Sequence, residues 1–233
     1  MSNNKHEPPD RSATTVYLVR HGVTDWNLDK RFQGQLDIPL SEEGWSQARA
    51  VARWLESRKA PFSALYSSDL SRAAQTAEAI GERLQLVPVL VTAFREINCG
   101  EWQGLSVGEV EQHYPGQLAE WREHVATFTL PGGESVPQVQ ARVFAAFREV
   151  VSRHAGESII IVSHGAALSA LQIAVFGWDL VTTWKASRTR LGNTGVTVLE
   201  ADPTTGMGHP ILGNSHEHLA NPTGLRSIMD QSA

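Results

Sequence analysis

The sequence predicts an α/β fold: a three-layer α/β/α sandwich with a mostly parallel central sheet of about six strands and a helical lid insertion. Largely apolar runs of strand length alternate along the 233 residues with longer segments whose apolar residues recur at helical spacing, which is the pattern of βαβ units. Two of these runs, residues 16–20 and 159–163, lead directly into the dipeptide His-Gly. Uninterrupted apolar runs are typical of strands buried on both faces.

Six segments are predicted to be strands, because each is a short apolar or alternating run bounded by turn-forming residues. Pro88 favours an edge position for the third strand, since proline cannot donate a hydrogen bond to a neighbouring strand. Asp202-Pro203 and Gly206 indicate a hairpin between the last two strands. In chain order the predicted strands are residues 16–20, 64–67, 87–91, 159–163, 194–200 and 209–212.

Five segments carry apolar residues at helical spacing and are predicted to be helices. Ser41 can cap the first, Ser68 or Asp69 can cap the second, and Ser135 opens a capping-box pattern before the fourth. The third is broken at Pro115-Gly116 and is expected to form the lid. In chain order the predicted helices span about residues 42–58, 72–84, 105–130, 135–154 and 166–176.

A single domain, residues 15–213, is expected to lie between two tails, with the lid at about residues 101–134. Residues 1–14 are rich in proline and polar residues and lack an apolar stretch, so they are predicted to be a disordered tail and not a secretion signal. Residues 214–233 are predicted to be a polar C-terminal tail.

Composition and charge exclude several classes of function. The formal net charge of −5 gives no overall attraction to nucleic acid or to an anionic membrane. No apolar run approaches the roughly 18 residues of a membrane span, so a cytoplasmic protein is expected. Cys99 is the single cysteine, which excludes an internal disulfide bond and disfavours a thiolate metal site. The sequence does not decide the oligomeric state, and a homodimer is compatible with it.

His216 and His218 have a spacing that metal ligands use, but a third ligand is missing near them. A solvated tail is therefore the favoured interpretation of this pair. No metal site is predicted anywhere in the chain.

Four side chains can form a site for a phosphoryl group, because ligands of open α/β sheets bind at the carboxyl ends of the strands. Arg20 and His21 end one His-Gly strand and His164 ends the other, while Arg72 lies in the first turn of a helix, where backbone N–H groups favour anions. Guanidinium groups match the oxygen pairs of a phosphoryl group. Near two arginines and a second imidazole, one histidine is expected to stay neutral and to attack phosphorus.

Each of these residues also has a simpler interpretation. Taken alone, Arg72 is equally compatible with an ordinary surface arginine, and His21 with a buried histidine whose hydrogen bonds are satisfied. The pairing of two His-Gly strands favours the site. A leaving alkoxide also needs a proton, and Glu96 and Glu101, in a glycine-rich loop, are the two candidates to supply it.

Six motifs together resemble the histidine phosphatases, also called the phosphoglycerate mutase-like superfamily. In the family's order they are LVRHGVTDWN, RFQGQLDIPLSEEGWSQA, SSDLSRAAQTA, FREINCGEWQG, GGES and VSHG, and the resemblance extends over about residues 16–219. R-H-G alone is a weak signal, but motifs in register along nearly the whole domain are a strong one.

The resemblance implies a role for each candidate. His21 would be the nucleophile that becomes phosphohistidine. Arg20, Arg72 and His164 would complete the phosphate pocket, and Glu96 would protonate the leaving group and later activate water. Asn27 and the backbone of Gln33 and Gly34 would line the substrate entrance, and Asn193 would lie at the edge of the pocket. The resemblance implies no metal and no other cofactor, except that a mutase would need 2,3-bisphosphoglycerate.

Three functions are compatible with these residues: a metal-independent phosphomonoesterase for a small phosphorylated metabolite, a phosphoglycerate mutase, and a non-catalytic phosphate-binding module. Residues 101–134 contain six glutamates and one arginine, Arg122, which disfavours a strongly anionic mutase substrate unless these acids face solvent. The segment FQGQLDIPL also resembles the phosphatase branch. The phosphatase is therefore favoured, and the binding module is disfavoured because every expected chemical position is filled.

Overall fold

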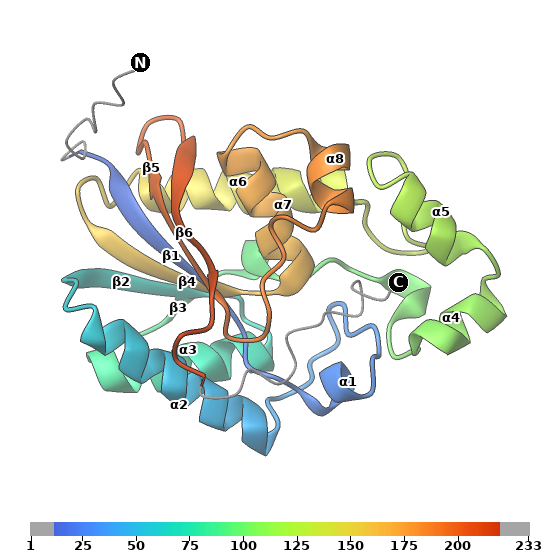
Figure 1. Cartoon of the computed structure of the whole chain (residues 1–233), viewed down its shortest axis with the longest axis horizontal. Helices are drawn as coiled ribbons and strands as arrows, with labels where there is room; N and C mark the ends of the chain where they lie inside the picture. Colours follow the sequence, from blue (N-terminus) through green and yellow to red (C-terminus); the bar gives the residue numbers. More distant parts are fainter. Residues whose placement is uncertain (1–11, 220–233) are drawn as a thin grey trace, which may run out of the picture.

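A computed structural model of the chain describes residues 12–219 and contains one mixed, mostly parallel sheet (Figure 1). Its strands are β1 (Thr14–Arg20), β2 (Phe62–Ser67), β3 (Val89–Leu90), β4 (Ser158–Ser163), β5 (Val196–Ala201) and β6 (Gly208–Ser215). Their order across the sheet is β3-β2-β4-β1-β5-β6. The first four run parallel, and β5 and β6 pair antiparallel with their neighbours. The six predicted strands are confirmed, and so is the edge position of the strand after Pro88.

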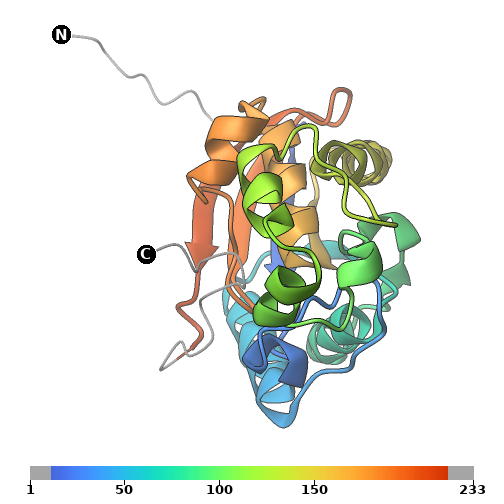
Figure 2. The same ribbon diagram turned by 90° about the vertical axis from the view of Figure 1, so that its right-hand side faces the viewer.

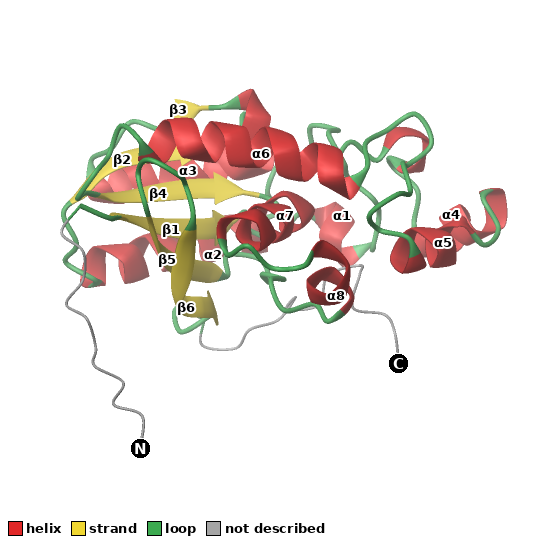
Figure 3. Cartoon of the chain, turned by 90° about the horizontal axis from the view of Figure 1, so that it is seen from above, coloured by secondary structure: helices red, strands yellow, loops and turns green. Residues whose placement is uncertain are grey.

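Helices cover both faces of this sheet, which confirms the predicted three-layer sandwich (Figures 1 and 3). They are α1 (Asp25–Leu28), α2 (Glu42–Ser57), α3 (Ser71–Leu84), α4 (Val107–His113), α5 (Gln117–Glu123), α6 (Val136–Val151), α7 (Gly165–Val175) and α8 (Leu180–Lys185). Two short 3-10 turns, Thr92–Phe94 and Gly100–Trp102, lie between β3 and α4. Within residues 12–219, no helix is both long and apolar enough to cross a lipid bilayer.

Strand β4 separates two hydrophobic cores, because successive side chains of a strand point to opposite faces. Ile159 and Ile161 belong to the core that includes side chains of α6 and α7, whereas Ile160 and Val162 belong to the core with α2 and α3. All four are fully buried. The apolar run in the sequence was therefore a correct signal for a strand buried on both faces.

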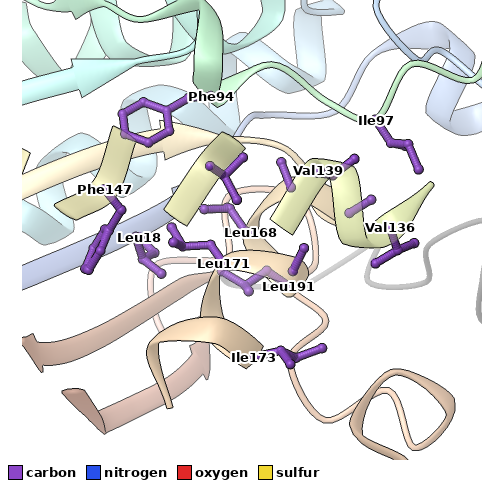
Figure 4. Close-up of a cluster of buried hydrophobic side chains, with 14 of the residues drawn as sticks. Leu18, Phe94, Ile97, Val136, Val139, Phe147, Leu168, Leu171, Ile173 and Leu191 are labelled. Atoms are coloured by element: carbon purple, nitrogen blue, oxygen red, sulfur yellow. The ribbon is translucent and has the colours of Figure 1, made fainter. Parts of the chain in front are cut away.

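The larger core also anchors the loop that precedes the lid. Phe94 and Ile97 pack in the same cluster as Val139 of α6 and Leu168 of α7, as Figure 4 shows. Burial of a side chain of this size contributes about 2 kcal/mol. Phe94 and Ile97 therefore anchor the loop on both sides of residue 96.

The helix caps were predicted with mixed success. Ser41 accepts a hydrogen bond from the Gly44 N–H, and Ser135 forms the expected capping box with the fourth predicted helix. Helix α3, however, has no side-chain cap. The prediction that Ser68 or Asp69 caps it was wrong, because both side chains have partners elsewhere: Ser68 contacts His164, and Asp69 accepts two hydrogen bonds from an arginine.

The lid follows the 3-10 turn Gly100–Trp102 and consists of α4 and α5, which flank the predicted break at Pro115-Gly116. It lies at the end of the sheet and faces the viewer in Figure 2. Trp102 is fully buried and packs edge-on against Trp121 of α5, with ring centroids 5.8 Å apart. Both tryptophans therefore pack the lid against the domain, whereas Trp178, just before α8, is 41% exposed.

Both ends of the domain extend further than predicted. Thr14 begins β1 and is fully buried, with its hydroxyl donating to the Val151 and His154 carbonyls. At the other end, β6 continues through Ser215, so residues 214 and 215, predicted to open a tail, belong to the sheet. The remaining predicted tail segments, residues 1–11 and 220–233, lie outside the described residues.

A solvated tail was predicted after β6, but this segment packs against the domain. Glu217 accepts a hydrogen bond from the Trp54 indole, and His218 Nε2 lies 3.0 Å from Thr194 Oγ1. His216 contacts the Asn214 carbonyl through Nδ1. Each imidazole is thus bound locally, and within residues 12–219 no group of three or more His, Cys, Asp or Glu side chains is arranged to hold a metal ion.

Candidate active site

The parallel pairing of β1 and β4 brings the two His-Gly imidazoles together, as predicted. Arg20 pairs with Ser163 in the sheet register, so the next residues, His21 and His164, leave the sheet at the same edge. Their ring centroids are 5.2 Å apart and both residues are buried. This edge is the carboxyl end of the parallel strands, where α/β sheets bind ligands.

The proton of the His21 imidazole is positioned by the backbone. His21 Nδ1 lies 2.7 Å from the Gly22 carbonyl oxygen, which can only accept a hydrogen bond, so Nδ1 carries the proton and Nε2 keeps its lone pair. Burial, together with the charges of Arg72 and Arg20, holds the pKa of His21 well below its usual value. The imidazole is therefore neutral at neutral pH and keeps a free lone pair on Nε2.

His164 is oriented by a serine. Its Nε2 lies 2.8 Å from Ser68 Oγ, which already accepts a hydrogen bond from the Leu70 N–H. The Ser68 hydroxyl can therefore donate to Nε2, which leaves the imidazole proton on Nδ1. That atom is buried and has no hydrogen-bond partner in the described chain. Burial and the neighbouring Arg72 hold the pKa of His164 well below its usual value.

Arg72 is a buried arginine and not a surface one. It is 1% exposed, and its Nη1 and Nη2 donate to the carbonyls of Leu36 and Gly34 at 2.9 and 2.8 Å. Its Nε is buried without a partner among the described residues. Burial lowers the pKa of Arg72 to about 10, so the side chain remains charged at neutral pH. A buried cation held by neutral carbonyls favours an anionic ligand.

Glu96 caps the helix that follows the second His-Gly strand. One carboxylate oxygen accepts hydrogen bonds from the Ile97 and Ala167 N–H groups, each at 2.9 Å, and the other accepts from the Ala166 N–H at 3.1 Å. A Cβ atom on Gly165 would lie 3.6 Å from the Arg20 guanidinium carbon and 3.7 Å from Glu96 Oε2. The carboxylate is thus fixed by the backbone, and Gly165 lies between it and the Arg20 guanidinium.

Glu101, the other candidate acid, lies outside the site. It is exposed and accepts a hydrogen bond from the Tyr114 hydroxyl at 2.9 Å. Of the two glutamates left open by the sequence, only Glu96 lines the cavity described next.

A cavity of about 580 Å³, its open mouth included, joins the catalytic candidates to the lid. It brings together seven of the nine predicted site residues, and His164 lies buried beside it. The residues that line it are Arg20, His21, Asn27, Arg31, Phe32, Gln33, Gly34, Arg72, Glu96, Ile97, Cys99, Trp121, Gly165 and Ala166.

Asn193, expected at the edge of the pocket, does not line the cavity. It is 4% exposed, and its Nδ2 donates to the His21 carbonyl at 3.1 Å and to Asn27 Oδ1 at 3.3 Å. The amide is used to hold the backbone of the candidate nucleophile and the side chain of Asn27. Asn193 is therefore a supporting residue beneath the site, whereas Asn27 lines the cavity.

An ion pair that no sequence pattern indicates supports the Glu96 loop. Arg142 of α6 donates to the carbonyls of Ala93, Arg95 and Glu96 at 2.7 to 2.9 Å and forms a two-pronged pair with Glu134. In the sequence Arg142 is an ordinary polar residue of a helix, and the GGES motif, which contains Glu134, was the only signal near this contact.

Replacing Arg142 by leucine is expected to lower the free energy of unfolding by about 3 kcal/mol, because it removes the cation that pairs with the partly buried Glu134 carboxylate and a donor from each of three carbonyls. Urea unfolding measures this. Arg153→Leu is the matched control: its pair with Glu149 is 60% and 67% exposed, so its loss is expected to stay below about 1 kcal/mol. Equal losses in the two variants would contradict the assigned role.

The lid glutamates do not face the cavity. None of the six counted in the sequence lines it. Glu123 pairs with Lys185 and Glu134 with Arg142, neither of which lines the cavity, whereas Glu109 pairs with Arg31, which does. Among the lining residues, three arginines accompany one carboxylate, that of Glu96. The charge counted over residues 101–134 is therefore not the charge that a ligand of the cavity meets, and it does not weigh against an anionic substrate.

The buried histidines are expected to make the fold sensitive to acid. Burial keeps the pKa of His21 and His164 well below the usual value and, with the nearby His216, lowers that of His218 to about 4. An unfolded chain takes up these protons near pH 6.5, at a higher pH than the folded chain does, so the free energy of unfolding should fall as the pH drops below about 6.5.

Thermal unfolding at about pH 7.5 and about pH 5 measures this dependence. A His218→Gln variant should lose part of it, since the imidazole that titrates is removed. A melting temperature that is the same at both pH values would contradict the assignment of neutral buried imidazoles.

Comparisons with known proteins agree with this geometry. The profile of the histidine phosphatase superfamily (branch 1) matches residues 16–207. Glucosyl-3-phosphoglycerate phosphatase of Mycobacterium tuberculosis is 36% identical over 215 residues, which cover 89% of this chain and 91% of the relative. A structure of the mycobacterial glucosyl-3-phosphoglycerate phosphatase with inorganic phosphate has a TM-score of 0.78 and 33% identity, and covers 88% of this chain and 99% of that one.

Relatives of two other kinds are also similar. Phosphoserine phosphatase 1 of Hydrogenobacter thermophilus is 36% identical, over 72% of this chain and 79% of the relative. A probable phosphoglycerate mutase of Salmonella choleraesuis is 32% identical, over 79% of this chain and 84% of the relative.

Proposed function

Because the chain belongs to branch 1 of the histidine phosphatase superfamily, we propose that it is a metal-independent phosphatase that hydrolyses phosphate monoesters of a small metabolite through a phosphohistidine on His21. The observation that carries the proposal is the state of the His21 imidazole. It is buried, its Nδ1 proton is held by the Gly22 carbonyl, and its pKa is depressed by burial beside Arg72.

In the first step the phosphoryl group lies between Arg20, Arg72 and His164. The unpartnered donors, Arg72 Nε and His164 Nδ1, would bind its oxygens and stabilise the charge that spreads over them in the transition state. Nε2 of His21 attacks phosphorus as the ester P–O bond breaks. Glu96 in its protonated form gives its proton to the departing oxygen, so that the leaving group departs as a neutral alcohol.

In the second step water replaces the alcohol. The Glu96 carboxylate, oriented by three backbone N–H groups, takes a proton from the water as its oxygen bonds to phosphorus. The P–N bond breaks, inorganic phosphate leaves, and His21 regains its Nε2 lone pair. The residues then stand as they did at the start of the cycle.

A phosphoglycerate mutase is the second candidate, and the excess of arginines around the cavity favours it. In that reaction the phosphoryl group would return from His21 to another hydroxyl of the same acid. The phosphatase is preferred because the loop FQGQLDIPL resembles that branch, and because the two relatives at 36% identity are phosphatases by name.

A single assay separates these functions. Phosphate release and product identity are followed together in EDTA, with a panel of phosphomonoesters and 3-phosphoglycerate, with and without 2,3-bisphosphoglycerate. Free phosphate from several esters, without isomerisation, is the expected result. Formation of 2-phosphoglycerate that depends on the bisphosphate, with little free phosphate, would identify a mutase. Neither reaction, with phosphate still binding, would identify a binding module.

A further inference from the structure

The lid end of the cavity contains a cation that the proposed mechanism does not use. Arg31 follows α1 and pairs through its backbone with Ser106 at the base of the lid. Its Nη1 donates to the Gly104 carbonyl at 2.8 Å and to Glu109 at 2.9 Å. Its Nε and Nη2 make no hydrogen bond with the described residues. The guanidinium is thus held on one side and keeps a pair of donors on the other.

Trp121, which lines the same cavity, contributes a buried donor. The residue is 2% exposed, it lines the cavity, and its indole N–H has no hydrogen-bond partner in the described chain. Its ring is fixed by edge-on packing against Phe32, at 6.3 Å between centroids, and against Trp102. Buried N–H groups are rarely left unpaired, so this one indicates that a ligand supplies an acceptor.

Gln33 adds an acceptor to the lining of the cavity. Its Oε1 is buried without a partner in the described chain, and the residue is 8% exposed. The unpaired atoms of the lining residues are therefore of more than one kind. Donors for a phosphoryl group lie at Arg72, an acceptor for a hydroxyl or ammonium group at Gln33, and further donors at Arg31 and Trp121.

We infer that Arg31 and Trp121 form a carboxylate-binding subsite, and that the substrate is a phosphate monoester of a hydroxy acid. The inference rests on the proposed function, since it concerns the leaving group of that reaction. A guanidinium edge matches a carboxylate with two parallel hydrogen bonds. Glu109 already balances the charge of Arg31, so a singly charged carboxylate suits this subsite better than a second phosphoryl group.

The test compares esters that differ in one carboxylate. The two pairs are O-phosphoserine with O-phosphoethanolamine, and 3-phosphoglycerate with glycerol 3-phosphate. Binding is measured by calorimetry on a His21→Ala background, which cannot turn the esters over. We expect the carboxylate member of each pair to bind roughly 10- to 100-fold more tightly, as for other hydrogen bonds to charged groups.

Two variants then assign this preference to its residues. Arg31→Gln removes the charge and Trp121→Phe removes only the indole N–H, and each should reduce the preference severalfold. Arg122→Gln is the matched control, because it changes a lid arginine that does not line the cavity, and it should leave the preference unchanged. Trp121→Phe keeps the ring and therefore tests the subsite even if Arg31→Gln fails to fold.

Equal affinity for both members of each pair, or a preference that survives both substitutions, would overturn the subsite. Hydrolysis of p-nitrophenyl phosphate by the native protein is measured in parallel and tests the proposed function separately. Tight binding of the carboxylate esters without any hydrolysis would refute the phosphatase while supporting the subsite. Hydrolysis without a carboxylate preference would do the reverse.

Discussion

The His21→Ala protein is expected to hydrolyse every phosphomonoester roughly 10,000-fold more slowly than the native protein, or worse. The loss should be this large because no other group can take its place. His164 lies 5.2 Å away between ring centroids, but its Nε2 faces Ser68 and its Nδ1 carries the proton. Phosphate release under saturating substrate measures the effect, and the leaving group should make little difference to it.

The control for this prediction is His209→Ala, which removes a histidine whose side chain is 70% exposed and lies on β6. That variant should retain native activity. Circular dichroism and thermal unfolding must show that the His21→Ala protein is folded. If a folded His21→Ala protein kept more than about 1% of native activity, far above the loss expected for a nucleophile, the phosphohistidine mechanism would be wrong.

Glu96→Gln is expected to lower the rate on alkyl phosphates by roughly 100- to 10,000-fold, the range that general acid catalysis contributes. The loss in the first step with p-nitrophenyl phosphate, measured as the burst of p-nitrophenolate, should be much smaller, because p-nitrophenolate leaves without a proton. The amide cannot supply that proton, although it keeps the shape of the side chain. The amide oxygen can accept hydrogen bonds from the Ile97 and Ala167 N–H groups, whereas the hydrogen bond from the Ala166 N–H is lost.

The comparison between the two substrates is the decisive part of this prediction. Glu101→Gln serves as the control, since Glu101 is exposed on the lid and contacts Tyr114, and it should change neither rate by more than about twofold, as for other surface substitutions. Equal losses on the alkyl and the aryl ester in Glu96→Gln would assign a structural role to this glutamate and would leave the acid unidentified.

The features that the sequence predicted correctly are those with a local cause. The two His-Gly runs have the apolar composition of strands buried on both faces, and the cores on either side of β4 confirm it. Pro88 cannot donate to a neighbour, and the strand after it lies at the edge. Ser135 forms its capping box with a residue three positions on, a contact that the sequence pattern contains in full.

The features that were missed depend on contacts between distant parts of the chain. Asp69 has the composition of a helix cap, yet Arg95 binds it across 26 positions. Arg142 reaches the Glu96 loop across 46 positions, and nothing in a helical segment indicates such a partner. Similarly, the sequence counted the lid glutamates but contained no information on which way they face.

The residues of the candidate site show the same difference between local causes and long-range contacts. Residues at the ends of strands, such as Arg20 and His21, could be placed from the topology alone, because the carboxyl ends of neighbouring parallel strands meet. Asn193 was expected at the edge of the pocket and does not line the cavity, but its amide holds the His21 carbonyl. Arg31 stood in a polar loop without a role, and only the folded chain places it in the lining of one cavity with Trp121.

The most direct test of the account is the identity of the phosphorylated residue. The Glu96→Gln protein is mixed with p-nitrophenyl phosphate, so that the first step proceeds and the water step is slow, and it is quenched in base, where phosphohistidine survives. Intact mass, phosphorus NMR and peptide mapping then locate the phosphoryl group. The account predicts one phosphoryl group per chain on Nε2 of His21. A phosphoryl group on Ser68 or His164, or product release without any phosphoenzyme, would contradict it.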